Sequence, residues 1–250
     1  MTARNQRVEI IGHRGSSHLA PENTLASLKL GWQETTTCEV DIQATLDGRL
    51  LVIHDDSTLR TTGIDLRVAE HALSDLQKLD AGAWKGEQWK RERLPSLEEA
   101  ITAMPAGKRL LVEIKAGPEI IPELVRVIQT SGKEMQLLLH SFSFPVCIQA
   151  RNALPGIPIY FLIAARLDPR TGAWSHSIDE TIMKIRPTGL SGLGANDTPL
   201  IEDEAVGKLH ASGLKLNIWT VDQPSEAKRL LDLGVDGLIT NRPGWMKEQL

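Results

Sequence analysis

The sequence predicts a (β/α)8 barrel of the α/β class, with an insertion after the second barrel strand. Short β-rich runs alternate with longer amphipathic segments along most of the chain, which is typical of a parallel sheet covered by helices. Nine runs are candidate strands, and two of them are too close together for a helix to connect them. Setting one of these two aside as a hairpin arm leaves eight parallel strands, the number in a closed barrel. A doubly wound sheet is the alternative, but no glycine-rich nucleotide turn follows the first strand.

The candidate strands, in chain order, are Val8–Gly12, Thr37–Gln43, Leu50–His54, Leu110–Ile114, Gln136–His140, Pro158–Leu162, Gly189–Gly192, Leu214–Trp219 and Gly237–Thr240. Helical patterns separate most of them, beginning with "PENTLASLKLGWQE", which Asn23 or Thr24 can cap. Gly213 and Gly234 stand where two later helices should end.

The hairpin arm is Leu50–His54, which follows the second barrel strand after a turn containing Asp47-Gly48. Asp-Gly is typical of a two-residue hairpin turn. Such a turn pairs Leu46 with Arg49, and counting outward from that pair places Asp41 opposite His54.

Length and charge favour one compact domain spanning residues 1–250. The chain has a formal net charge of −4, which argues against a nucleic-acid-binding protein. The N-terminal "MTARNQRVEII" lacks the apolar stretch of a signal peptide, and no later segment resembles a membrane span, so we expect a cytoplasmic protein. Cys38 and Cys147 lie far apart in apolar runs, which favours two buried free thiols. A homo-oligomer is left open.

Residues from about 55 to 94 have no role in the barrel pattern. A connection of this length between barrel elements is typical of a lid or a substrate-binding insertion. A purely structural cap explains the same stretch equally well, so both interpretations stay open.

Three carboxylates fall at the ends of predicted strands. Glu39 and Asp41 are two residues apart, so they share one face of a strand. Glu113 ends another strand, with Lys115 two residues further on. Functional groups of such barrels gather at the carboxyl ends of the strands. Three hard oxygen donors without a nearby cysteine favour Mg²⁺ or Ca²⁺ as the bound cation.

Two histidines and two cations are predicted at the same end. His13 and Arg14 directly follow the first strand, and His54 ends the hairpin arm. Imidazoles suit proton transfer near neutral pH. Arg14 and Lys115 would neutralise an anionic substrate, and a guanidinium can hold two of its oxygens at once.

His140 and Trp219 close two further strands at this end. His140 is a candidate for contact with the substrate. Trp219 can form an apolar wall of the pocket, although ordinary core packing explains it nearly as well.

Several motifs together resemble those of the glycerophosphodiester phosphodiesterases. They begin with "HRG", "APENT", "CEVDIQATLDGRLLVIHDDSTLRTTG" and "LVEIK" and continue through "LDAGAWKG", "LPSLEEAI", "HSFSF", "NIWTVD" and "DGLITNRP", so the resemblance covers nearly the whole chain in order. The resemblance implies a metal-dependent barrel enzyme that cleaves a glycerophosphodiester to glycerol 3-phosphate and an alcohol. It leaves open whether a glycerol hydroxyl attacks first to give a cyclic phosphate.

The resemblance also implies roles for individual residues: Glu39, Asp41 and Glu113 as metal ligands, His13 as general base, His54 as general acid, and Arg14 and Lys115 as phosphate contacts. Three positions depart from the family pattern, and the change at Gly12, where alanine is more frequent, is a minor one. His140 stands where glutamine is frequent, and Asn241 stands where aspartate is frequent. A lysophospholipase D and a non-catalytic phosphodiester-binding barrel are the alternatives, and the pair of histidines argues against the second.

Overall fold

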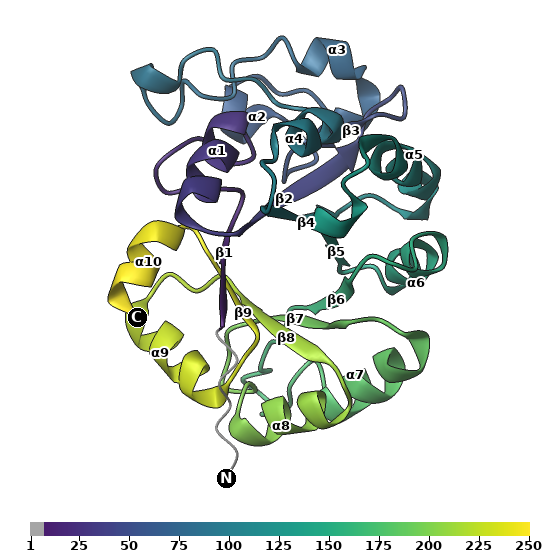
Figure 1. The fold of residues 1–250 in the computed structure, drawn as a ribbon, viewed down its shortest axis with the longest axis vertical. Helices are drawn as coiled ribbons and strands as arrows, with labels where there is room; N and C mark the ends of the chain where they lie inside the picture. Colours follow the sequence, from purple (N-terminus) through teal and green to yellow (C-terminus); the bar gives the residue numbers. More distant parts are fainter. Residues whose placement is uncertain (1–7) are drawn as a thin grey trace.

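The computed structural model, which describes residues 8–250, contains eight parallel strands that close into a barrel. Each strand pairs with its neighbours in parallel, and the first pairs with both the second and the last. Helices surround this ring of strands (Figure 1). The predicted (β/α)8 fold is confirmed. The barrel strands are β1 Glu9–Gly12, β2 Thr37–Ala44, β4 Arg109–Ile114, β5 Leu137–Ser141, β6 Ile159–Ile163, β7 Gly192–Asn196, β8 Lys215–Trp219 and β9 Gly237–Thr240.

The helices outside the barrel are α1 Leu25–Glu34, α4 Leu97–Ala103, α5 Ile121–Ser131, α6 Phe144–Ala153, α7 Ile178–Ile185, α8 Asp203–Ala211, α9 Pro224–Leu233 and α10 Pro243–Gln249. Of the two candidate caps of α1, Thr24 is the one that acts, because its side chain accepts the N–H of Ser27. Gly234 ends α9 in the left-handed region at φ 77°, as a helix-terminating glycine does. None of the described helices is long and apolar enough to cross a membrane.

The hairpin on β2 has a different register from the predicted one. Its second arm, β3 Leu50–Val52, pairs Ile42 with Val52, and Ile53 donates its N–H to the carbonyl of Asp41. Ile53 therefore takes the place predicted for His54 opposite Asp41. The reason is a three-residue loop, in which Thr45 and Arg49 close the ladder and Gly48 turns the chain at φ 72°.

The seventh barrel strand also differs from the prediction of Gly189–Gly192. Gly189 follows the 3-10 helix η5 Arg186–Thr188 and adopts φ 73°, a left-handed conformation that cannot begin a strand. The strand starts at Gly192 instead. The run "GLGAN" is short of the β-branched residues that mark strands, which explains why the prediction stopped early.

Two apolar layers lie on the two sides of the barrel wall. The larger one fills the space between the strands and the helices and includes Val40 and Ile42 of β2. The smaller one fills the barrel interior and consists of Ile11, Leu111, Leu138, Tyr160 and Ile239, with Trp219 packed against it. Glu39 and Asp41 alternate with Val40 and Ile42 and so face the interior, above this apolar layer. Both cysteines are free and buried, as predicted.

The stretch from about 55 to 94 packs as a small layer beyond β3, at the top of Figure 1. Its short elements are α2 Leu59–Thr62, η1 Val68–Glu70, α3 Leu73–Leu76 and η2 Glu87–Trp89. Val68 and Leu76 of these elements form an apolar cluster separate from the barrel layers. Its other members are Leu51, Ile53, Ala81 and Leu94. The hairpin arm β3 and the residue after it thus supply the surface on which this stretch folds.

Replacing either of two helical glycines by alanine should change the free energy of unfolding, but in opposite directions. A Cβ at Gly207 in α8 would meet no atom within 4 Å, so Gly207→Ala should raise the free energy of unfolding by about 0.5–1 kcal/mol through helix propensity. A Cβ at Gly31 in α1 would lie 2.5 Å from Cys38 Sγ and 3.1 Å from backbone atoms of Gly15 and Ser16. Gly31→Ala should therefore lower the free energy of unfolding by about 1–3 kcal/mol, although it gains the same helix propensity. Denaturant unfolding of both variants measures the difference, and a stabilised Gly31→Ala would contradict this packing.

Candidate active site

The mouth of the barrel, where the strands end, holds a cavity of about 290 Å³. Charged and imidazole side chains dominate one part of its lining: His13, Arg14, Glu39, His54, Glu113, Lys115, His140 and Arg166. Apolar side chains, among them Phe142, Leu162 and Trp219, line another part. A cavity that combines apolar walls with converging titratable groups is typical of a catalytic site.

The turn after β1 explains the order His-Arg-Gly. Arg14 takes a left-handed φ of 53°, which is costly for a residue with a Cβ. The turn is held because the Arg14 N–H donates to Glu39 Oε2 at 2.9 Å and the Arg14 carbonyl accepts the Ser27 hydroxyl at 2.8 Å. Gly15 follows at φ 86°, where a Cβ would lie 2.6 Å from the carbonyl oxygen of Ser27. The backbone is thereby fixed with the side chains of His13 and Arg14 at the cavity.

Asp41 is buried among positive and polar groups. Arg14 Nε lies 3.2 Å from its Oδ2, Lys115 Nζ lies 3.2 Å from its Oδ1, and the Asn23 amide donates to Oδ2 at 2.9 Å. Burial alone would raise the pKa of Asp41, but Arg14, Lys115, His54 and Asn23 lower it to about 2. Asp41 therefore stays ionised and ties the two cations of the mouth together.

Lys115 lies between two carboxylates. Its Nζ is 2.7 Å from Glu113 Oε1 as well as 3.2 Å from Asp41. Burial alone would lower the pKa of Lys115, but Asp41 and Glu113 raise it above its usual value, so the ammonium group remains charged.

A group able to hold a metal ion is formed by Glu39, Glu113 and His140. One ligand atom of each lies within 4.8 Å of the other two. Glu39 and His140 are buried, and His140 Nε2 has no hydrogen-bond partner. A buried polar atom without a partner is rare in proteins, and a bound cation would satisfy it. The donor set of this mouth therefore fits a divalent cation, with Asp41 lying next to the group rather than within it.

His54 is oriented by the inserted stretch. Its Nδ1 is 2.6 Å from Asp55 Oδ1, and Asp55 Oδ2 accepts from Arg60 Nε at 2.6 Å. Arg60 also binds both oxygens of Glu22, which in turn pairs with Arg14 at 2.6 Å. Burial alone would raise the pKa of Asp55, but Arg60 and His54 lower it below its usual value. Asp55 therefore stays ionised, and its contact with Nδ1 fixes the orientation of the His54 ring.

His13 has a neutral partner instead. Its Nδ1 lies 2.8 Å from Asn241 Oδ1, which also accepts the Ser17 hydroxyl. The amide orientation is set by Asp222, whose Oδ2 accepts the Asn241 NH₂ at 2.5 Å and whose Oδ1 accepts the Asn241 backbone N–H at 2.8 Å. Since Asn241 Oδ1 can only accept, His13 Nδ1 carries the proton and its Nε2 is free to take one.

The apolar wall consists of Trp219 and Phe142. Their rings lie edge to face with centroids 5.5 Å apart, and Phe142 is exposed at the cavity. Trp219 lines the cavity and also packs on the interior apolar layer. Both roles predicted for it, pocket wall and core packing, are therefore present.

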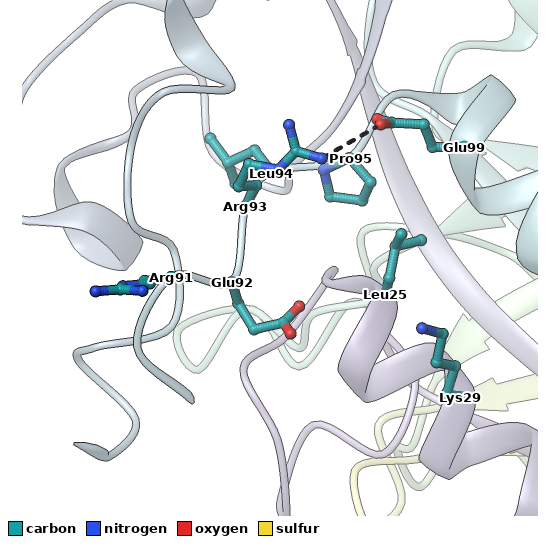
Figure 2. A pocket seen from close by; sticks show the side chains of 8 residues that line it. All are labelled: Leu25, Lys29, Arg91, Glu92, Arg93, Leu94, Pro95 and Glu99. Carbon is teal, nitrogen blue, oxygen red and sulfur yellow. Dashed lines mark ion pairs between the residues drawn. The ribbon is translucent and has the colours of Figure 1, made fainter. Parts of the chain in front are cut away.

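A second cavity, of about 180 Å³, lies between α1 and the inserted stretch (Figure 2). Leu25 and Lys29 of α1 face residues 91–95 there, and Arg93 is 3.8 Å from Glu99. It shares no lining residue with the mouth cavity, and its charged groups are ion pairs and surface side chains. The convergent titratable groups therefore favour the mouth of the barrel as the site.

The predicted site residues converge at this mouth: seven of them line the cavity, and Asp41 contacts two of those seven. Sequence reasoning missed Asp55, Arg60 and Asn241 as partners of the histidines. Asp55 follows His54 directly, so adjacency was the available signal for it. Arg60 and Asn241 reach their partners through the fold, and no spacing in the sequence indicates them.

Comparison with known proteins agrees with the geometry of this site. The profile of the Glycerophosphoryl diester phosphodiesterase family matches residues 13–245. The chain belongs to this family. A glycerophosphodiester phosphodiesterase of Caldanaerobacter subterraneus subsp. tengcongensis is 31% identical over 94% of this chain and 94% of its own. One from Bacillus subtilis is 29% identical over 95% of this chain and 84% of its own.

Among solved structures, this member of the glycerophosphoryl diester phosphodiesterase family resembles a phosphodiesterase of Oleispira antarctica. That structure was determined in complex with the product sn-glycerol-3-phosphate. The TM-score is 0.85 at 29% identity, and the match covers 96% of each chain.

Proposed function

We propose that this protein hydrolyses glycerophosphodiesters to glycerol 3-phosphate and an alcohol, as a single domain over residues 1–250 with an insertion at about 55–94. The observation that carries the proposal is the mouth cavity, where two imidazoles, two cations and a carboxylate group converge. Family membership supports the same reaction.

In the proposed mechanism Arg14 and Lys115 bind the phosphate oxygens and stabilise the charge that builds on them. His13 Nε2 takes a proton from the attacking water, whose oxygen forms the new bond to phosphorus. His54 gives a proton to the departing alcohol oxygen as its bond to phosphorus breaks. The partners of the histidines support their roles, because Asn241 Oδ1 holds the Nδ1–H of His13 and leaves its Nε2 free, and Asp55 holds the His54 ring at the cavity.

Glu39 and Glu113 are proposed to hold the divalent cation, Mg²⁺ or Ca²⁺. Asp41, which contacts Arg14 and Lys115 in this structure, is proposed as the third carboxylate ligand of the same cation. When bound, such a cation polarises phosphoryl oxygens and offsets their developing charge. The carboxylates otherwise repel one another, and Lys115 between Asp41 and Glu113 offsets part of that repulsion. The same lysine can turn to the phosphate once a cation neutralises the acids.

The direct test is release of glycerol 3-phosphate from glycerophosphocholine, with Mg²⁺, with Ca²⁺ and with EDTA. We expect turnover that EDTA abolishes. A panel of head-group diesters identifies the preferred alcohol. Binding of these diesters without turnover under any ion would favour the non-catalytic phosphodiester-binding barrel.

A lysophospholipase D activity is the second candidate, because exposed Phe142 beside Trp219 offers an apolar surface at the cavity. Turnover of lysophosphatidylcholine at a higher kcat/KM than glycerophosphocholine would favour it. A cytoplasmic location stays a prediction, which cell fractionation tests. The oligomeric state stays open, and gel filtration measures it. The two buried free thiols support a reducing compartment.

Asn241→Ala should lower kcat by roughly 10–100-fold with KM changed less than about threefold, because it removes the acceptor that orients His13. Steady-state kinetics on glycerophosphocholine measures both constants. Asn152→Ala, an exposed asparagine of α6, is the matched control and should behave as the wild type. Unchanged kcat in Asn241→Ala would remove the positioning role from Asn241.

A further inference from the structure

His140 is the one imidazole lining the cavity that the proposed mechanism does not use. It lies on β5, in register with Glu113 of the neighbouring strand β4, and both side chains face the barrel interior. The side chain of His140 is only 4% exposed. Its Nε2 is buried and makes no hydrogen bond, which is unfavourable unless another group, such as a cation, binds it.

The spacing around Nε2 is too long for a direct hydrogen bond but fits a shared cation. His140 Nε2 is 3.7 Å from Glu39 Oε1, beyond the reach of a hydrogen bond. Ligands about 2.1–2.4 Å from one ion are about 3.0–3.4 Å apart when adjacent and about 4.2–4.8 Å apart when opposite. The group of Glu39, Glu113 and His140, within 4.8 Å of one another, falls inside that range.

We propose that His140 Nε2 is a nitrogen ligand of the cation held by Glu39 and Glu113, and that it shifts the site toward first-row transition ions. Imidazole binds such ions more strongly than Mg²⁺ or Ca²⁺, which prefer oxygen. This inference rests on the cation site of the proposed function and changes its predicted ion class.

The alternative is that His140 carries a proton and faces Glu39 as an ion pair without a metal. The two cases differ in whether a nitrogen couples to the bound ion. Full-length protein stripped with EDTA and loaded with one equivalent of Mn²⁺ should show ¹⁴N coupling in pulsed EPR. His140→Gln should bind Mn²⁺ without that coupling, because glutamine offers only oxygen at this position.

Two other histidines line the cavity, so His13→Gln and His54→Gln are the matched controls and should keep the coupling. A coupling that persists in His140→Gln, or is absent from Mn²⁺-loaded wild type, would overturn the proposal. Titration calorimetry gives a second readout. His140→Gln should weaken Co²⁺ binding by about 10-fold or more while Ca²⁺ affinity changes less than about threefold. Equal weakening of both ions would also overturn it.

These readouts separate the two proposals. Nitrogen coupling from His140 without any release of glycerol 3-phosphate would sink the proposed function and leave the ligand role standing. Turnover in an enzyme whose Mn²⁺ shows no nitrogen coupling would support the proposed function and reject the ligand role of His140. Failure to bind any divalent ion would remove both.

Discussion

His54→Ala and His13→Ala should each lower kcat on glycerophosphocholine by about 10²–10⁴-fold, because each removes one of the two proton-transfer groups. Both side chains line the mouth cavity and neither belongs to the apolar core, so the fold should persist. Steady-state release of glycerol 3-phosphate measures the loss, and circular dichroism checks the fold.

The matched control is His18→Ala, an exposed histidine in the same loop as His13 that does not line the cavity. It should retain wild-type kcat. Wild-type turnover in His13→Ala or His54→Ala would refute the role assigned to that residue. A diester with a good leaving group, such as a nitrophenyl ester, adds a finer test. Loss of the general acid should matter much less for it, so His54→Ala should recover rate on it and His13→Ala should not.

Glu113→Gln should weaken binding of the activating divalent cation by about 10–100-fold or more, because it replaces a charged ligand by a neutral amide. It also removes the ion pair between Glu113 and Lys115, while the ion pair between Lys115 and Asp41 remains. The metal concentration that gives half-maximal activity should rise accordingly. Saturating metal should restore part of kcat.

Glu134→Gln serves as the control for Glu113→Gln. Glu134 lies in η4 Glu134–Gln136, just before β5, and is exposed. Its replacement changes the net charge by the same amount without touching the cavity, so its metal titration should match that of the wild type. An unchanged titration in Glu113→Gln would remove Glu113 from the ligand set.

The sequence predicted the barrel well because each barrel unit carries its own local signal. Helices such as "IIPELVRVIQTSG" have an apolar period typical of an amphipathic helix, and strands such as "LLVEI" are short β-rich runs between them. The weakest strand, β7, lacks that signal, and its position was misjudged for that reason. The site followed from the same regularity, since residues at carboxyl ends of parallel strands meet at one mouth.

What the sequence could not give was the set of partners that orient the site. The register of the hairpin depended on whether the turn held two residues or three, and Asp-Gly is compatible with both. The contacts of Arg60 with Glu22 and of Asn241 with His13 join residues 38 and 228 positions apart. Such contacts are products of barrel closure, which a linear pattern does not encode. The same holds for the approach of His140 to Glu39.

The apolar layer inside the barrel limits how molecules can travel through the enzyme. This layer fills the barrel beneath the carboxylates and consists of Ile11, Leu111, Leu138, Tyr160 and Ile239. Only the carboxyl-terminal end of the barrel is therefore open to solvent at the site. The diester must enter there, and the alcohol and glycerol 3-phosphate must leave there. Free glycerol 3-phosphate should compete with the diester for this entrance, so turnover should slow as the product accumulates.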